Sequence, residues 1–383
     1  MALATVHQQA LAAIAKSNHT LICFPEAVSG DGVGSALGLG MALEGLRPGH
    51  QVDVACSGFT DTHRQQYQFL PNVDRVRPTL ASIHELTIRV NLKTATVDAL
   101  RYDVKDDHLN IHLTPASGEL TKEHIESAMS SFKYDLVIVL DCADLSSLGA
   151  LYTNHAQFFQ STPIIAIDHA PEHERYGQIN LVDLAAVACG EVCAAFLRDV
   201  SPACLNADVA TCLLTGILAE TRGFRHPRMT PKTFDVTAAL LTGGARREDV
   251  VQHLFQTKTI GQLKLWGRAL SRLRHDPDRG IIWTLLSQGD FLAAGAVESD
   301  LLDIVDELLV NAPAAHCILL CYEQKDGTTC VIARTPNGRY DAARLLAPLG
   351  GSGTPLLARA CLATKDLVAA ERTVLEAVRK SAV

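Results

Sequence analysis

Two apolar runs in the middle of the chain end abruptly in acidic or imidazole side chains. The run Asp135–Leu140 leads directly into Asp141, and the run Pro163–Ile167 leads into Asp168 and His169. Neither run alternates with polar residues, which is typical of strands buried on both faces of a parallel sheet. In such sheets, the loops that leave the carboxyl ends of the strands line the ligand crevice. The pattern therefore predicts a binding site after these strands, although an Asp-His pair considered alone is more often an ordinary polar loop.

Strands and helices alternate along the first two thirds of the chain, which indicates an α/β fold with a parallel sheet. His19–Phe24 and Gln51–Cys56 predict two further strands, and a glycine-rich turn leads from the first into a helix over Asp31–Leu46. Further helices are predicted over Met1–Lys16, Thr121–Ser130, Leu184–Leu197, Ala207–Glu220, Pro231–Thr242 and Arg246–Phe255.

Short alternating runs between Glu85 and Leu113 interrupt this pattern. Their hydrophobic period of two, broken by Lys/Thr and Asp-Asp turns, predicts antiparallel strands. We interpret residues 85–113 as an inserted β-hairpin that extends the sheet of a first domain formed by residues 1–256.

The pattern changes again after residue 256. A helix over Thr259–Arg274 predicts a helical linker of residues 257–278. From Gly280 onward, strands and helices alternate again, so residues 279–383 are predicted to form a smaller second α/β domain. Its predicted elements are the strands GIIWTLLS, HCILLCY and TCVIAR, the helices LLDIVDELL and DAARLLAPL, and a closing helix after Lys365.

Composition and charge limit the classes of function. The 383 residues are 48% hydrophobic and carry a net charge of −8, which argues against a partner such as long nucleic acid bound through its backbone. No apolar run approaches the ~20 residues that span a bilayer, so we expect no membrane partner. Eleven cysteines without paired spacing predict reduced thiols and a cytoplasmic location.

Acidic and imidazole side chains recur where a predicted strand or helix meets a loop. They are Asp31, Asp141, Asp168 with His169, and Glu220. Carboxylate oxygens with one imidazole form a ligand set that suits Mn or Mg. Each has an ordinary alternative, since Asp31 can cap its helix and Glu220 can be a solvated helix end. Four such places converging on one sheet edge favour a metal site.

Four sequence motifs, in a fixed order along the chain, indicate the class of protein more specifically. They read SGDGVGS at Ser29–Ser35, VIVLDCAD at Val137–Asp144, IAIDHA at Ile165–Ala170 and GILAETRGF at Gly216–Phe224. This series resembles the motifs of the DHH phosphoesterase family, and the C-terminal region resembles the DHH-associated substrate domain. The likeness is greatest to the nanoRNase and phosphoadenosine-phosphate phosphatase branch. It implies hydrolysis of short oligonucleotides or small nucleotides with two Mn ions.

The departures from the family pattern fall on particular positions. Pro25 and Ser29 stand where the resemblance implies a His and an Asp, and Ala170 stands where it implies the second His of the Asp-His-His motif. The resemblance implies a first metal at the positions of Pro25, Ser29 and Asp141. These three residues cannot hold an ion, so that metal is lost. The other is held by Asp31, Asp141, His169 and Glu220, of which Glu220 replaces an Asp. The resemblance therefore implies one Mn or Mg ion, with Asp168 and His169 as catalytic residues.

The C-terminal domain supplies the implied substrate contacts, namely Arg334, Gly350, Gly351, Gly353 and Thr354. Thr354 stands where the resemblance implies a His, and the glycine loop is expected to offer backbone N–H groups to a phosphate. Its alternative is a tight turn between helix and strand. Arg222, Arg225 or His226 could add positive charge.

Three functions remain open at this stage. One is a phosphoesterase with impaired two-metal hydrolysis. Another is a non-catalytic homologue that binds a small nucleotide or short oligonucleotide in a regulatory role. The third is a scaffold whose cleft has no ligand. A homodimer is possible in each case.

Overall fold

The computed structural model describes residues 2–80, 83–85, 88–127, 131–256, 258–301, 304–305, 312, 314–336 and 339–381. The chain divides into two compact units, Met1–Gln256 and Thr257–Val383. None of the described helices is long and apolar enough to cross a membrane.

The first unit is built on a six-stranded parallel sheet in the order β12-β11-β10-β1-β2-β3. The strands are β1 (His19–Cys23), β2 (Gln51–Ala55), β3 (Val76–Arg77), β10 (Leu136–Leu140), β11 (Ile164–Asp168) and β12 (Ile179–Val182). Strand order reverses direction at β1, with β2 on one side and β10 on the other. Such a switch point opens a crevice at the carboxyl ends of the strands, and the predicted parallel sheet is confirmed.

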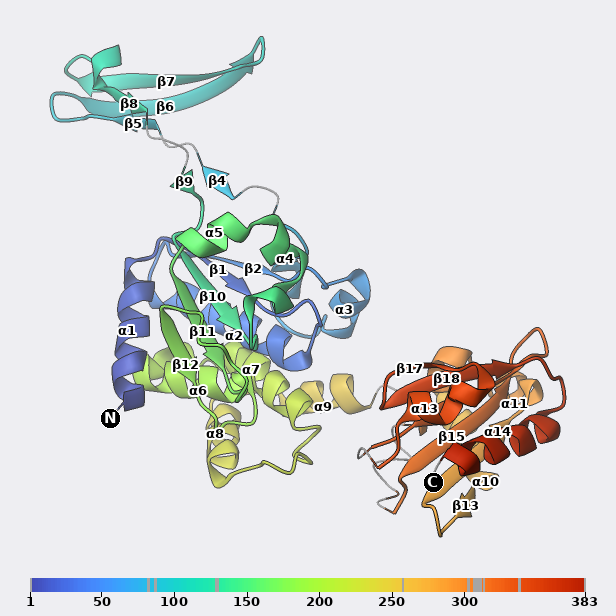
Figure 1. Ribbon diagram of the computed structural model, residues 1–383. Helices are drawn as coiled ribbons and strands as arrows, with labels where there is room; N and C mark the ends of the chain where they lie inside the picture. Colours follow the sequence, from blue (N-terminus) through green and yellow to red (C-terminus); the bar gives the residue numbers. More distant parts are fainter. Residues whose placement is uncertain are drawn as a thin grey trace. The chain divides into compact units, whose positions relative to one another are not determined.

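Apolar side chains cover both faces of this sheet. Alternate residues of β10 point to opposite faces, so that Ile138 packs with one core cluster and Val139 with the other. One face carries α1 (Ala2–Lys16), α2 (Gly30–Leu46), α6 (Cys189–Val200) and α7 (Ala207–Glu220). The other carries η3 (Leu145–Leu148), α4 (Ala150–Asn154) and α5 (Ala156–Ser161) (Figure 1). This explains why β10 and β11 are apolar without alternation.

The remaining elements of the first unit are short or peripheral. They are α3 (Asp61–Gln66), η1 (Val73–Arg75), η4 (Pro202–Cys204), α8 (Pro231–Thr242) and α9 (Arg247–Phe255). The bounds predicted for α7 and α8 agree with the structure, because Asn206 and Thr230 cap the two helices at their amino ends.

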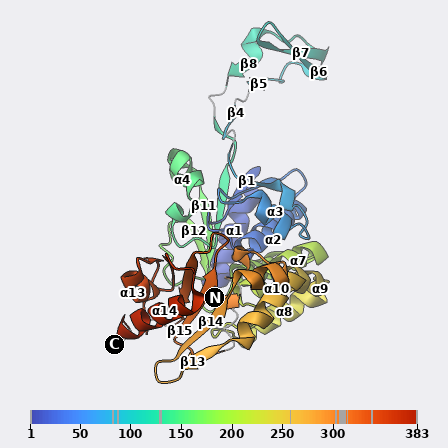
Figure 2. The ribbon, with the colours of Figure 1, turned by 90° about the vertical axis from the view of Figure 1, so that its right-hand side faces the viewer.

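The inserted segment forms its own small sheets and does not extend the parallel sheet as predicted. Its strands are β4 (His84–Glu85), β5 (Ile88–Val90), β6 (Thr96–Lys105), β7 (His108–Ser117), β8 (Ile125–Ser127) and β9 (Ser131–Phe132). They pair antiparallel as β4 with β9, β5 with β8 and β6 with β7 (Figures 1 and 2). The insertion is therefore longer than residues 85–113, and β3 already pairs with β2 at that edge of the parallel sheet.

A second correction concerns two predicted helices. The helix predicted over Thr121–Ser130 is a 3-10 turn, η2 (Lys122–His124), followed by β8, and residues 128–130 lie outside the described residues. Strand β8 pairs antiparallel with β5 where the helix was predicted. The helix predicted from Leu184 begins only at Cys189, because the Asp31 carboxylate accepts hydrogen bonds from the amides of Cys189 and Gly190.

The second unit contains a mixed sheet in the order β13-β14-β15-β16-β18-β17. Its strands are β13 (Arg274–Asp276), β14 (Ile281–Leu286), β15 (Cys317–Glu323), β16 (Thr329–Arg334), β17 (Ser352–Gly353) and β18 (Leu357–Leu362). Among the described strands of this unit, only β14 and β15 pair in parallel. The helical elements are α10 (Ile260–Ser271), α11 (Gln288–Ala294), η5 (Glu298–Asp300), α13 (Ala342–Leu346), η6 (Ala347–Leu349) and α14 (Leu367–Ser381). Most of the predicted helix LLDIVDELL lies outside the described residues.

The segment predicted as a linker, residues 257–278, belongs to this second unit. Leu265 and Ala269 of α10 are buried in its core, and Arg274–Asp276 forms an edge strand. The segment therefore packs as part of the unit and is not a separate connection.

The cysteine prediction also needs correction. Cys330 and Cys361 face each other across β16 and β18 and form a disulfide. Their separation of 31 residues has no characteristic spacing, so only strand pairing reveals it. The other nine cysteines are free thiols.

Candidate metal centre

Three predicted ligands meet at the carboxyl end of the parallel sheet. Asp31 lies in the first turn of α2, Asp141 directly follows β10, and His169 directly follows β11. One donor atom from each of the three lies within 4.8 Å of the other two. The topology produces this meeting, because β1, β10 and β11 are adjacent and parallel.

Two of the three separations between these donor atoms are short enough for ligands of one divalent cation. His169 Nε2 lies 3.5 Å from Asp141 Oδ1 and 4.0 Å from Asp31 Oδ2. Two ligands each about 2.1 Å from one ion lie at most about 4.2 Å apart. Carboxylate oxygens with one imidazole nitrogen suit Mn or Mg. The residues present therefore fit a divalent cation.

Asp31 is fully buried and held rigidly. Its Oδ1 accepts hydrogen bonds from Gly190 N at 2.9 Å and Ser35 Oγ at 3.0 Å, and its Oδ2 accepts one from Cys189 N at 2.6 Å. A Cβ added at Gly216 would lie 2.6 Å from Asp31 Oδ1, so glycine there leaves room for the carboxylate. The amino end of α6 favours an anion at this position.

Two pKa values are raised at the centre. Burial, and then the nearby Asp141 carboxylate, raise the pKa of Asp31 to about 7. Burial alone would lower the pKa of His169, but its hydrogen bond to Asp141 and the neighbouring carboxylates outweigh this, and the pKa is raised. Charges held this closely without a cation are unfavourable, which is a further sign that the site suits a positive ion.

Asp141 adopts a left-handed backbone conformation with φ of 56°. Its amide continues the β10–β11 ladder by donating to the carbonyl oxygen of Ile167 at 3.0 Å. An aspartate in this conformation at the end of a buried strand is the kind of strained residue found at functional sites. Its Oδ1 lies 3.5 Å from His169 Nε2.

Ser29 takes a different role from the ligand that the resemblance implies. Its Oγ donates to Asp141 Oδ2 at 3.1 Å and accepts a hydrogen bond from Gly32 N at 2.8 Å, capping α2. One Asp141 oxygen therefore faces Ser29, while the other faces His169. The sequence marked Ser29 as a departure, but only the structure shows what the hydroxyl binds.

The other departures line a hollow of about 600 Å³ beside Asp141. Pro25 and Ala170 form part of its wall, together with Asp168. Asp168 Oδ1 accepts hydrogen bonds from the amides of His169 and Ala170 at 2.6 and 3.0 Å, so it shapes the loop that carries His169. Its Oδ2 is buried and has no hydrogen-bond partner among the described residues. Burial raises the pKa of Asp168.

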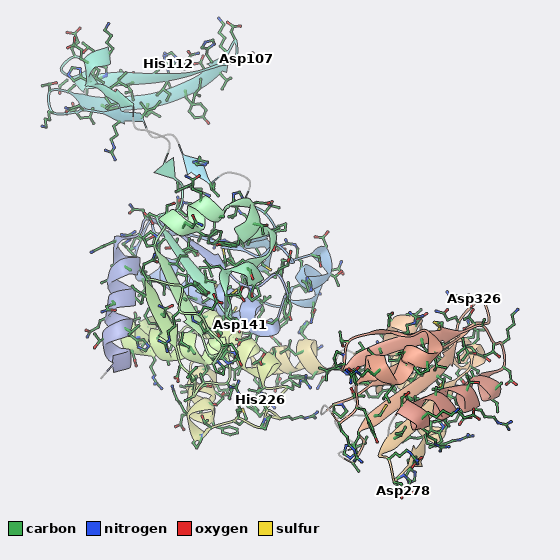
Figure 3. All side chains as sticks on the ribbon, in the orientation of Figure 1. Asp107, His112, Asp141, His226, Asp278 and Asp326 are labelled. Carbon is green, nitrogen blue, oxygen red and sulfur yellow. A yellow bond between two sulfur atoms is a disulfide. The ribbon has the colours of Figure 1, made fainter. Side chains whose placement is uncertain are left out.

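Glu220 does not join the cluster formed by the described ligands. It is the last residue of α7 and lines a second hollow, of about 470 Å³, together with Ser29, Arg222, Arg225 and His226. Arg222 has a φ of 50°, and no acidic partner is found for Arg222 or Arg225 in the described part of the chain. The structure thus places positive charge beside the centre. Asp141 and His226 are labelled in Figure 3.

The residues predicted to contact substrate in the second unit lie near one another. Arg334 is the last residue of β16 and pairs with Leu357 of β18. The amide of Leu357 donates a hydrogen bond to Thr354 Oγ1. The expected phosphate loop is less open than predicted, because the amides of Gly350, Gly351 and Thr354 already donate to carbonyl oxygens within the unit. Gly350 and Gly353 have positive φ angles of 71° and 150°, so glycine serves the turn itself.

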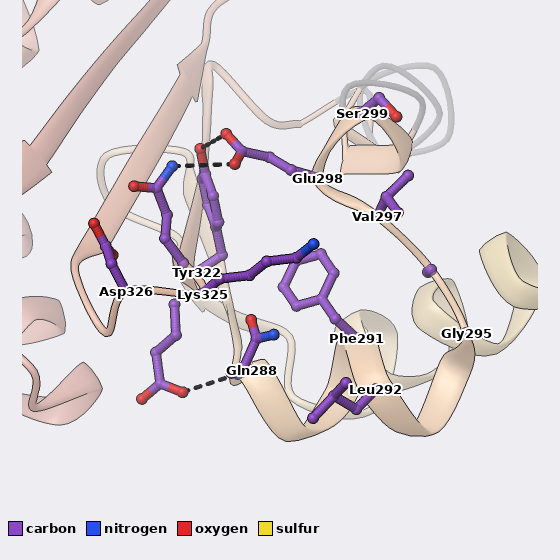
Figure 4. Close-up of a pocket in the computed structure, with 13 residues that line it drawn as sticks. Gln288, Phe291, Leu292, Gly295, Val297, Glu298, Ser299, Tyr322, Lys325 and Asp326 are labelled. Carbon is purple, nitrogen blue, oxygen red and sulfur yellow. Dashed lines mark hydrogen bonds between the residues drawn. The ribbon is translucent and has the colours of Figure 1, made fainter.

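A hollow of about 700 Å³ in the second unit had no signal in the sequence. It is lined by Phe291, Leu292 and Tyr322 with Glu298 and Lys325 (Figure 4). Glu298 accepts hydrogen bonds from Tyr322 Oη at 2.7 Å and Gln324 Nε2 at 3.0 Å, and it pairs with Arg359 at 2.7 Å. The Glu298 carboxylate in this hollow is therefore already engaged by the protein.

The chain is similar in sequence to known proteins. No protein-family model matches the chain. The sequence is 30% identical over 217 residues to the bifunctional oligoribonuclease and PAP phosphatase NrnA of Thermus thermophilus, which covers 57% of this chain and 64% of that protein. It is 31% identical over 106 residues to a probable bifunctional oligoribonuclease and PAP phosphatase NrnA of Streptococcus mutans, covering 28% and 32%. The chain thus matches less than two thirds of the length of these relatives.

A solved structure extends the likeness to the whole fold. An exopolyphosphatase-related protein from Bacteroides fragilis superposes with a TM-score of 0.64 at 15% identity, covering 99% of this chain and 96% of that one. The parallel sheet and its carboxylate-imidazole cluster define an α/β protein with a candidate divalent-metal centre. Together with the sequence relatives, these features make the chain similar to DHH-family phosphoesterases.

Proposed function

We propose that this chain is a metal-dependent DHH phosphoesterase that acts on small nucleotides or short oligonucleotides with one Mn or Mg ion. The observation that carries the proposal is the cluster of Asp31, Asp141 and His169 at the switch point of the sheet. The names of the Thermus and Streptococcus relatives support the substrate class.

The side chains around Asp141 support a single ion. Ser29 donates a hydrogen bond to Asp141 Oδ2, whereas Oδ1 faces His169. Neither the hydroxyl of Ser29 nor the ring of Pro25 supplies an anionic or imidazole ligand on the Ser29 side of Asp141. A carboxylate that bridges two ions needs ligands on both sides, and here only the His169 side has them.

A bound divalent ion would polarise a phosphate oxygen and acidify a water molecule. The protein's own contribution is to hold the ligands rigidly and to supply cations for the substrate. Arg222, Arg225 and His226 line the hollow next to Ser29, and guanidinium groups suit phosphate oxygens. We assign them to phosphate contact, with Glu220 in the same hollow.

Turnover tests this proposal directly. Purified protein saturated with Mn is expected to release mononucleotide from pApA or phosphate from phosphoadenosine-phosphate. Asp141→Asn is expected to lower kcat/KM at least about 100-fold, because the ion loses a carboxylate. Glu44→Gln, which changes a carboxylate of α2 paired with Arg75, is the matched control and should leave the rate unchanged. Absence of turnover in the wild type on both substrates would reject the hydrolase.

A second candidate is a non-catalytic member that binds a nucleotide without turnover. The observation that favours it is the loss of ligand side chains at Pro25, Ser29 and Ala170, two of which line an open hollow beside Asp141. Calorimetric titration with the same nucleotides in Mn separates the two candidates. Binding without hydrolysis supports this second function, and no heat with any nucleotide rejects it.

We retain the cytoplasm as the proposed location. Its support is the nine free cysteines found in the described part of the chain, all but Cys204 buried. The Cys330–Cys361 disulfide is the feature that this proposal has to accommodate.

A further inference from the structure

The β6–β7 ribbon of the insertion carries an apolar face that no part of the described chain covers. Three pairs of apolar residues lie directly opposite each other on the two strands, namely Leu100 with Leu113, Tyr102 with Ile111 and Val104 with Leu109. Because side chains alternate in direction along a strand, these six residues share one face. Five of them are exposed, with exposed fractions from 44% for Ile111 to 72% for Val104.

The opposite face of the ribbon is polar. Arg101 pairs with His112 and Asp103 with Asn110, and His112 Nε2 lies 3.1 Å from Asp103 Oδ1. Asp106 and Asp107 form the turn with φ angles of 52° and 60°, which suit a two-residue turn that keeps the register of the strands. The register therefore separates an apolar face from a charged one, and the side chains stand on both sides of the ribbon in Figure 3.

The insertion has almost no core to stabilise it. Ala95 is the single buried side chain among the described residues 88–125. A two-stranded ribbon is at best marginally stable in water unless its apolar face packs against something. Long exposed apolar strands are also a liability that proteins normally cover. These facts indicate that the face is covered in the functional state.

We propose that the apolar face of β6 and β7 packs against the same face of a second copy of this chain, forming a homodimer. The six-residue face lacks any titratable group other than the Tyr102 phenol, so it has no charge with which to recognise an anionic or cationic partner. A partner must offer a matching apolar surface, and a second copy carries one of identical length and width. A two-fold axis places the same patch on both sides of the interface.

The area is sufficient for such a dimer. Ten-residue strands are about 34 Å long, and two ribbons packed face to face lie about 10 Å apart. Their contact would remove on the order of 1,000 Å² from water, which is the lower limit for a specific interface. Ile88, Leu92 and Ile125 are exposed next to the ribbon in sequence and can add to it.

Sedimentation of the full chain over a range of concentrations tests the proposal. We expect a reversible dimer, and we expect Tyr102→Glu to raise its Kd at least about 100-fold, because two buried carboxylates would face each other. Thr114→Glu places the same charge on the opposite face of the ribbon and should change Kd by less than about threefold. Equal weakening by both variants would overturn the assignment of the face.

A deletion provides a test that does not depend on folding of the ribbon. Glu85 and Ser131 are directly paired between β4 and β9, so an Asn-Gly turn can join them in place of residues 86–130. The shortened chain should be monomeric and should keep the thermal unfolding of the rest of the first unit. A dimer that survives the deletion, or a wild type that is monomeric at about 100 µM, rejects the proposal. Flotation of the wild type, but not of Tyr102→Glu, with lipid vesicles would assign the face to a membrane surface instead.

These outcomes are independent of the metal centre. A monomeric Tyr102→Glu variant that still binds Mn would support the dimer surface whatever the result of the hydrolysis assays.

Discussion

Ser29 lies at the position where the family resemblance implies a metal ligand, and it serves two structural purposes there. It caps α2 through Gly32 N and donates to Asp141 Oδ2. A hydroxyl satisfies a carboxylate oxygen without bringing a charge, so the Asp141 side chain is stabilised on that side without a second cation.

Restoring the missing side chains should therefore restore a second ion. In the triple variant Pro25→His, Ser29→Asp, Ala170→His we expect bound Mn to rise from one to two ions per chain, measured by elemental analysis after dialysis. Ser29→Ala removes the hydroxyl without adding a ligand and should stay at one. A triple variant that folds and still binds one ion would contradict the attribution of the lost ion to these three side chains.

Asp53 is a residue whose charge stabilises the first unit away from the metal centre. Its Oδ2 lies 3.1 Å from His19 Nε2, 2.8 Å from Lys133 Nζ and 2.9 Å from Tyr134 Oη. The hydrogen bond from His19, then those from Lys133 and Tyr134, hold the pKa of Asp53 well below its usual range. The ionised form is thus favoured by folding.

The sign of the pH dependence follows from that depressed pKa. The contribution of Asp53 to the free energy of unfolding is complete above the unfolded pKa of about 3.9 and is lost as the pH falls from there through the folded pKa. We expect Asp53→Asn to lower the free energy of unfolding by about 1–2 kcal/mol at pH 7, after allowance for solvent screening. The difference from wild type in urea unfolding should shrink below pH 4.

Asp74→Asn is the control for that measurement. Its side chain is 86% exposed and lies 3.5 Å from Arg64, so its loss should have little effect at any pH. An equal pH dependence in both variants would show that Asp53 is not the group responsible.

At the scale of elements, α2 and α7 approach each other closely through glycines. A Cβ at Gly34 would lie 2.3 Å from the carbonyl oxygen of Cys212 on α7. This contact brings Gly216 of α7 against Asp31, so helix packing and ligand position are linked.

Substitution within α2 tests this link. Gly34→Ala should lower the free energy of unfolding by about 1–3 kcal/mol, because the helices must move apart. It should also weaken Mn binding, measured by calorimetry. Gly45→Ala in the same helix has nothing within 4 Å and should instead raise stability by up to about 1 kcal/mol. Normal Mn affinity in Gly34→Ala would separate packing from ligand position.

At the scale of the whole molecule, the candidate metal ligands and the tryptophans belong to different compact units. Asp31, Asp141 and His169 lie in Met1–Gln256, whereas Trp266 and Trp283 lie in Thr257–Val383. Each unit has its own hydrophobic core clusters. Unfolding of the two units can therefore be followed separately.

Mn should stabilise the first unit alone. At a free concentration 100-fold above Kd, the ion adds about 2.7 kcal/mol to the free energy of unfolding of the unit that binds it. The corresponding calorimetric transition should move to higher temperature and return on addition of EDTA. The tryptophan fluorescence transition of the second unit should not move. A shift in both transitions would show that the units unfold together.

Much of the fold was predictable because it depends on local pattern. The apolar runs of β10 and β11 predicted strands buried on both faces. The bounds of α7 and α8 followed from apolar stretches with capping residues at their starts. The positions of Asp31, Asp141 and His169 at element ends were equally visible. Each of these signals lies within a few residues of the feature that it marks.

The tertiary structure decided what depends on residues far apart in sequence. The late start of α6 at Cys189 is set by the carboxylate of Asp31, 158 residues earlier, and the disulfide joins cysteines 31 residues apart across two strands. Strand pairing likewise determined that the insertion forms sheets of its own, and helix packing left Glu220 outside the ligand cluster. The sequence by itself determined which side chains stand at the ends of buried strands and helices. Only the packed chain decided which of them meet, because the register and crossing of distant elements leave no local pattern to read.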